Sequence, residues 1–105
     1  MPCSRNDVVL LPIPFTDLSS HKVRPAIVIG LGIFPGDLFV VPLTSRLANA
    51  DFPLTDWQAA GLNIPSAVKA QLATVESRLV RKIVGQISDR DRATLDAHLR
   101  RWLNL

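Results

Sequence analysis

The chain has 105 residues and a formal net charge of +3, from twelve Lys and Arg against nine Asp and Glu. Apolar residues make up 48% and charged residues 20%, a composition that excludes a disordered chain. The length fits one domain, residues 1–105, with a thin core. Its apolar stretches are far shorter than the roughly 20 residues of a membrane-spanning helix, and the N-terminus lacks the apolar core of a signal peptide. We expect a cytoplasmic protein that does not enter membranes.

Cysteine and histidine usage argues against a soft-ligand metal site. Cys3 is the single cysteine, so it cannot form an internal disulfide. Together with the two histidines it offers no spacing typical of zinc binding. We therefore expect neither a metal nor a cofactor.

Three strands are predicted in the first 43 residues. Residues 7–14 are rich in Val, Leu and Ile on both alternating faces, which favours a buried strand. Residues 25–31 and 38–43 are also apolar and are separated by glycine- and proline-containing turn residues, which indicates a hairpin. A loop centred near Phe34 places residues whose numbers sum to about 68 opposite each other.

This register places two polar side chains opposite each other at the open end of the hairpin. Val28 then faces Val40, and Arg24 faces Thr44, so a cation and a hydroxyl converge. Pro25 and Pro42 flank this pair and cannot donate to a ladder, so we expect an irregular end or an edge there. The alternative is an ordinary surface arginine beside a strand-end hydroxyl.

The second half of the chain predicts two more strands and a helix. Residues 57–65 form a Gly- and Pro-punctuated connection, and 67–75 and 79–87 are each predicted as a strand. Ser88 is a helix cap, with Asp89 and Asp91 in the first turn. The expected architecture is a small antiparallel β barrel or sheet with a C-terminal amphipathic helix.

Side chains of this helix divide into two faces. The apolar stripe that is expected to pack on the sheet consists of Leu95, Leu99, Trp102 and Leu103. Asp96 stands at i, i+4 spacing from Arg100, which predicts an ion pair on the solvated face.

Four segments, in order, resemble the MazF/PemK family of type II toxin–antitoxin toxins. The first is residues 7–29, which include Arg24-Pro25, and the second is Val41-Pro42-Leu43-Thr44-Ser45-Arg46. Residues 65–74 and 79–88 are similar to the third and fourth segments of the family. Together these matches cover nearly the whole chain.

The resemblance implies an SH3-like barrel, a homodimer, and a sequence-selective, metal-independent endoribonuclease that cleaves single-stranded RNA. It also implies a cognate antitoxin, a segment of which fills the RNA site. In the family, the arginine before the proline and the threonine of the second segment are functional. These positions are Arg24 and Thr44 here.

The chemistry of such cleavage suggests a role for each residue. Arg24 can clamp a phosphate oxygen and stabilise developing charge, and Thr44 can add a hydrogen bond. Arginine titrates far above neutral pH, so it is a poor general base there. His21, with an ordinary pKa of about 6.5, is the more natural proton carrier; the alternative is a solvated loop histidine.

The third segment departs from the family pattern. Many relatives have Arg-x-Asp there, whereas this chain has Lys69-Ala70-Gln71. The basic charge is kept and the carboxylate is missing. The general base, and with it the retention of catalysis, is left open.

RNA binding is predicted at a basic rim of Lys22, Arg46 and Lys69, which can neutralise phosphates. Ser45 and Gln71 lie in the matched segments and are assigned to RNA binding with them. Either Phe15 or Phe52 can stack on a splayed base. The alternatives are solvated basic side chains and phenylalanines of the core.

Two other functions fit the same fold. One is a non-enzymatic toxin that poisons a protein such as DNA gyrase, whose activity survives Arg24→Ala and is lost on changes near Trp102. The other is a module that binds RNA or a partner and has lost catalysis, as the missing carboxylate suggests.

Overall fold

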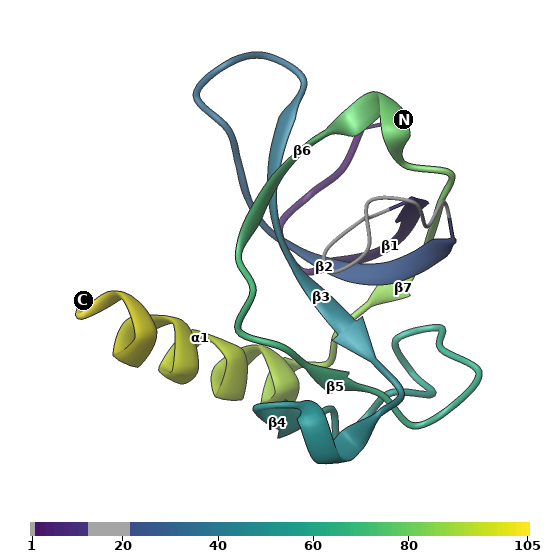
Figure 1. Cartoon of the computed structure of the whole chain (residues 1–105), viewed down its shortest axis with the longest axis vertical. Coiled ribbons are helices and arrows are strands. Elements are labelled where there is room, and N and C mark those ends of the chain that lie inside the picture. Colours follow the sequence, from purple (N-terminus) through teal and green to yellow (C-terminus); the bar gives the residue numbers. More distant parts are fainter. Residues whose placement is uncertain (1, 13–21) are drawn as a thin grey trace.

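A strongly curved antiparallel sheet carries one C-terminal helix (Figure 1). The computed structural model describes residues 2–12 and 22–105. The strands are β1 Asp7–Pro12, β2 Val23–Leu31, β3 Asp37–Thr44, β4 Phe52–Pro53, β5 Ala67–Val68, β6 Ala73–Glu76 and β7 Lys82–Gln86. Short 3-10 turns span Leu47–Asn49 and Ser77–Leu79, and helix α1 spans Asp89–Leu103.

The strand order is β4-β5-β3-β2-β1-β7, and β6 pairs with β3. Within the described ranges no ladder joins β7 to β6 or to β4, so the sheet curves like a barrel without closing. The predicted class, mostly β with a C-terminal helix, is confirmed. No helix in the part of the chain that the structure describes is long and apolar enough to cross a membrane.

The predicted hairpin forms, and its register is the expected one. Val28 pairs with Val40, and the ladder continues to Ala26 opposite Pro42. A bulge between Val28 and Gly30 shifts the pairing toward the turn. At the tip, the Gly32 N–H donates to the Asp37 carbonyl at 2.8 Å. The strand predicted over 7–14 is observed as β1, and its last two residues lie outside the described ranges.

The prediction of one strand over 67–75 is wrong, because the chain turns after two paired residues. β5 ends at Val68, and β6 begins at Ala73. Between them the Gln71 N–H donates back to the Lys69 carbonyl at 2.8 Å, which closes a tight turn. The second predicted strand is shorter than 79–87, since a 3-10 turn precedes β7.

The sheet has an apolar core on each of its two faces. Successive side chains of β1, β2 and β3 point to opposite faces of the sheet, and buried apolar side chains lie on both faces. One core packs beneath α1 and contains Val8, Ile27, Val41, Leu95 and Leu99. The other lies inside the curve of the sheet and contains Val9, Leu11, Ala26, Val28 and Val40.

Helix α1 begins at the predicted cap, and fewer of its apolar side chains than predicted pack on the sheet. The Ser88 hydroxyl accepts the Asp91 N–H at 3.2 Å. Leu95 and Leu99 are buried and Trp102 is half-buried, but Leu103 is 49% exposed. Leu103 was wrongly placed in the stripe because the last turn of α1 extends beyond the sheet (Figure 1).

The predicted ion pair between Asp96 and Arg100 is also wrong. The Asp96 carboxylate lies 2.7 Å from the Arg5 guanidinium, at the opposite end of the chain. A partner distant in sequence therefore takes the place of the i, i+4 neighbour.

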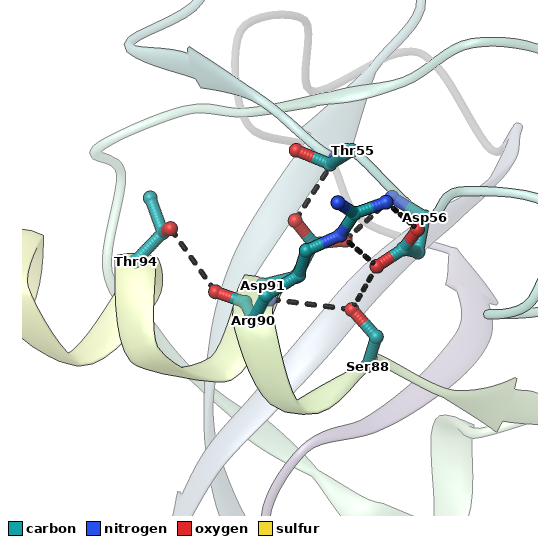
Figure 2. Close-up of polar contacts among 6 residues, drawn as sticks. All are labelled: Thr55, Asp56, Ser88, Arg90, Asp91 and Thr94. Carbon is teal, nitrogen blue, oxygen red and sulfur yellow. Dashed lines mark hydrogen bonds and ion pairs between the residues drawn. The ribbon is translucent and has the colours of Figure 1, made fainter.

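A polar network joins the N-terminus of α1 to the turn at 55–61 (Figure 2). Asp91, only 2% exposed, accepts the backbone N–H groups of Thr55 and Asp56 at 2.9 and 2.8 Å. Asp56 in turn accepts from the Ser88 hydroxyl and from two nitrogens of Arg90. Hydrogen bonds from Arg90, then Ser88, lower the pKa of Asp56 to about 2.

Candidate functional site

Strands β2 and β3 separate at the open end of their hairpin. Their ladder ends at Ala26 and Pro42. Beyond it, Arg24 of β2 pairs with Leu11 of β1, whereas Thr44 of β3 pairs with Ala67 of β5. The two prolines supply no N–H groups for a continued ladder, so each strand follows its outer neighbour. We call this separation point, residues 23–25 and 43–44, the fork.

Arg24 and Thr44 lie on the same face of the sheet at the fork. Side chains alternate along a strand, so Arg24 shares the face of Ala26 and Val28, and Thr44 shares the face of Val40. The last ladder pair, Ala26 and Pro42, fixes these two faces as one. The register therefore places Arg24 and Thr44 on one face, but the prediction that they pair with each other is wrong, because Arg24 pairs with Leu11 and Thr44 with Ala67.

The backbone that follows Thr44 orients its hydroxyl group. The Arg46 N–H donates to Thr44 Oγ1 at 3.0 Å. The hydroxyl also carries one hydrogen, with which it can donate to another group. Ser45, Arg46 and Arg24 are exposed at the same end of the sheet, and Thr44 is half-buried.

A second loop reaches the fork through β5. The Lys69 N–H donates to the Pro42 carbonyl at 3.1 Å, one residue beyond the β3·β5 ladder. Lys69 thus lies beside Pro42, the last residue of β3 in its ladder with β2, and Gln71 follows Lys69 in the tight turn. Both side chains are half-buried. The structure places Lys69 beside β3, the strand that carries Thr44, and Gln71 follows it in the turn.

Asp51 is a residue of this region that the sequence motifs did not indicate. Its carboxylate accepts the Ala70 N–H at 2.7 Å, in the middle of the Lys69–Gln71 turn. Asp51 lies outside all four matched segments, about 20 residues before the turn. Sequence spacing gives no signal for it, because the contact depends on the pairing of β4 with β5.

Other predicted residues have different outcomes. His21 and Phe15 lie outside the described ranges, and Lys22 is exposed directly before β2. Phe52 is 7% exposed and its ring stacks on His98 with centroids 4.1 Å apart, so it belongs to the core rather than to a base-stacking surface.

The described residues hold no group of three or more His, Cys, Asp or Glu side chains that could bind a metal ion. What the fork offers chemically is a guanidinium, an oriented hydroxyl and further cations. These groups bind phosphate and stabilise negative charge on it.

The sequence matches the family model of the PemK-like, MazF-like toxins of type II toxin–antitoxin systems over residues 4–103. The chain belongs to this family. The match spans both the fork and α1, so it includes every described element of the site. No match to the sequence was found among curated proteins.

Solved structures of other proteins share the fold. The Mycobacterium tuberculosis toxin MazF-mt6 is 16% identical with a TM-score of 0.74, and the match covers 94% of this chain and 97% of that one. An endoribonuclease in complex with its cognate antitoxin, from Mycobacterial species, is 17% identical with a TM-score of 0.67. That match covers 96% of this chain and 92% of the other.

Proposed function

We propose that this MazF-like toxin is an endoribonuclease that cleaves single-stranded RNA at the fork without a metal ion. The observation that carries the proposal is the common face of Arg24 and Thr44, with Lys69 and Arg46 beside them. Family membership adds support, as does the fold shared with a protein described as an endoribonuclease.

The proposed reaction is attack of the ribose 2′-hydroxyl on the adjacent phosphorus, with departure of the 5′-oxygen and formation of a 2′,3′-cyclic phosphate. Negative charge grows on the non-bridging phosphate oxygens in the transition state. Arg24 donates two parallel hydrogen bonds to these oxygens, and the Thr44 hydroxyl donates a third. Such preorganised donors stabilise the transition state without a metal.

Two protons must also move, one from the 2′-hydroxyl and one to the leaving oxygen. An arginine side chain is a poor general base near neutral pH, because a guanidinium holds its proton strongly. We assign both transfers to His21 as a proton carrier: its neutral imidazole takes the proton of the 2′-hydroxyl and then gives it to the leaving 5′-oxygen, a task that an ordinary pKa of about 6.5 suits.

The proposed partners are single-stranded RNA, a cognate antitoxin and a second copy of the chain. Lys22, Arg46 and Lys69 bind the RNA phosphates, and Ser45 and Gln71 contribute hydrogen bonds. An acidic antitoxin segment complements the net charge of +3. The cytoplasmic location remains a prediction.

The test is cleavage of mixed-sequence single-stranded RNA by the purified protein in EDTA. We expect discrete cuts whose products end in a 2′,3′-cyclic phosphate. Arg24→Ala should lower the cleavage rate by about 10²- to 10³-fold. Arg101→Ala, which removes an exposed arginine of α1, should leave it unchanged and is the matched control.

Intact RNA with folded wild-type protein would contradict the proposal and favour a binding module or a toxin that poisons a protein. For the gyrase alternative the structure offers little support at Trp102. This side chain packs against the core, with its ring 5.6 Å from that of His98.

A further inference from the structure

The turn that carries Lys69 and Gln71 is held by three hydrogen bonds. Two join backbone groups: the Lys69 N–H donates to the Pro42 carbonyl, and the Gln71 N–H donates to the Lys69 carbonyl. The third joins the Ala70 N–H to Asp51 Oδ2 at 2.7 Å. Among the described side chains, Asp51 is the one that holds the backbone of this turn.

Asp51 is itself fixed against the sheet. Its own N–H donates to the Val68 carbonyl at 2.9 Å, which extends the β4·β5 pairing by one step. The next residue, Phe52, is buried in the core beneath α1. The carboxylate therefore projects from a rigid strand edge, while its own residue is exposed at the surface.

The location of this anchor matters for the fork. Val68 pairs with Leu43, and Lys69 bonds to Pro42, so the turn is attached directly to β3, two residues before the strand ends at Thr44. If the register of β4 and β5 is continued by one residue, Asp51 stands beside Lys69. The turn thus has one end at Pro42, directly beside the fork, and its middle on Asp51.

We propose that Asp51 is a positioning residue for RNA binding: its carboxylate holds Ala70 and thereby presents Lys69 and Gln71 to the RNA strand. A carboxylate that the segment Lys69–Gln71 lacks in its own sequence thus reaches the same turn from elsewhere in the chain. The inference rests on the proposed function and adds a residue to it.

Two physical effects of removing this carboxylate have opposite signs. Simple electrostatics predicts tighter RNA binding, because the protein becomes more positive near the phosphates. Loss of the anchor predicts weaker binding, because the turn must then be ordered at the moment of binding. The direction of the change in RNA affinity therefore distinguishes a positioning role of the Asp51 carboxylate from a purely electrostatic effect of its charge.

The experiment compares Asp51→Ala and Asp51→Asn with the wild type. Asp89→Ala is the matched control, since it removes the same charge from a carboxylate side chain that is 99% exposed. The dissociation constant for single-stranded RNA is measured by fluorescence anisotropy, and kcat and KM are measured by cleavage of the same RNA.

We expect Asp51→Ala to raise Kd and KM about three- to tenfold, the effect of one hydrogen bond, with kcat little changed. Asp51→Asn should recover most of the affinity, because its amide oxygen can accept the same N–H. Asp89→Ala should bind as the wild type does or slightly more tightly.

Amide hydrogen exchange at Ala70, measured without RNA, reports the anchor itself. Exchange should be faster in Asp51→Ala and close to wild type in Asp51→Asn, in proteins whose other amides remain protected. This measurement also identifies a variant that has simply unfolded, since protection is then lost throughout.

Three results would overturn the inference: unchanged or tighter RNA binding by folded Asp51→Ala, unchanged exchange at Ala70, or a loss confined to kcat and shared by Asp51→Asn. The last would assign Asp51 to proton transfer. Failure of the wild type to bind any RNA would instead overturn the proposed function, and the exchange data would then still report the anchor.

Discussion

At the scale of single residues, Asp91 shows how a polar side chain in the first turn of a helix becomes part of the core. Its position alone predicts a favourable interaction with the helix dipole, typically below about 1 kcal/mol. In the fold it is 2% exposed and accepts two backbone N–H groups of the turn at 55–61. A buried carboxylate with two such donors contributes more than an exposed one, because its removal leaves the donors without an acceptor.

We therefore expect Asp91→Ala to lower the free energy of unfolding by about 2–4 kcal/mol. Asp89→Ala, in the same helical turn, removes a carboxylate side chain that is 99% exposed and should cost less than about 1 kcal/mol. Urea denaturation of the two variants checks this difference. Equal losses would show that the dipole, rather than the two buried bonds, accounts for the effect of Asp91.

At the scale of elements, the start of α1 and the turn at 55–61 are held together by charge. Asp56 receives the Ser88 hydroxyl and two nitrogens of Arg90, which lowers its pKa from 3.8 to about 2. The same contact raises the pKa of Arg90. The turn also approaches β7 closely, since a Cβ at Gly61, whose φ is 90°, would lie 2.2 Å from the Val84 carbonyl oxygen.

This contact predicts acid sensitivity of a definite sign. The pKa of Asp56 is lower in the folded chain than in the unfolded one, so its contribution is complete above about pH 4 and is lost as the pH falls toward 2. The midpoint of urea unfolding should therefore fall less steeply between pH 4 and pH 2 in Asp56→Asn than in the wild type. A variant as acid-sensitive as the wild type would rule out this role for Asp56.

At the scale of the whole molecule, the distribution of positive charge distinguishes two basic regions. Arg24 lies in the fork with Arg46 and Lys69 next to it, whereas Arg100 and Arg101 lie in the last turn of α1. The proposed function assigns RNA phosphates to the first region. The net charge of +3 is the same whichever region binds RNA.

The salt dependence of RNA binding shows which of the two basic regions contacts the RNA phosphates. If Arg46 contacts one phosphate, Arg46→Ala should reduce the slope of log K against log salt concentration by about 0.7, the value for single strands. Arg101→Ala should leave the slope unchanged. Measurement of Kd at several salt concentrations provides the test, and equal slopes for wild type and Arg46→Ala would remove Arg46 from the interface.

Several features of the fold could be predicted because they depend on neighbours in sequence. The turn near Phe34 and the apolar alternation on either side of it determine the hairpin register, so Val28 faces Val40 as expected. The hydroxyl of Ser88 caps the residues that directly follow it. The same counting places Arg24 opposite Thr44, but β2 and β3 separate before that pair, so Arg24 pairs with Leu11 and Thr44 with Ala67.

Other features depend on contacts between distant segments and were decided only by the tertiary structure. Asp96 binds Arg5 rather than Arg100, and Leu103 is exposed because the sheet ends before the helix does. Asp51 reaches Ala70 because β4 pairs with β5. Sequence periodicity determines the elements and the faces of this protein, but only packing determines which polar groups from distant segments lie within hydrogen-bonding distance.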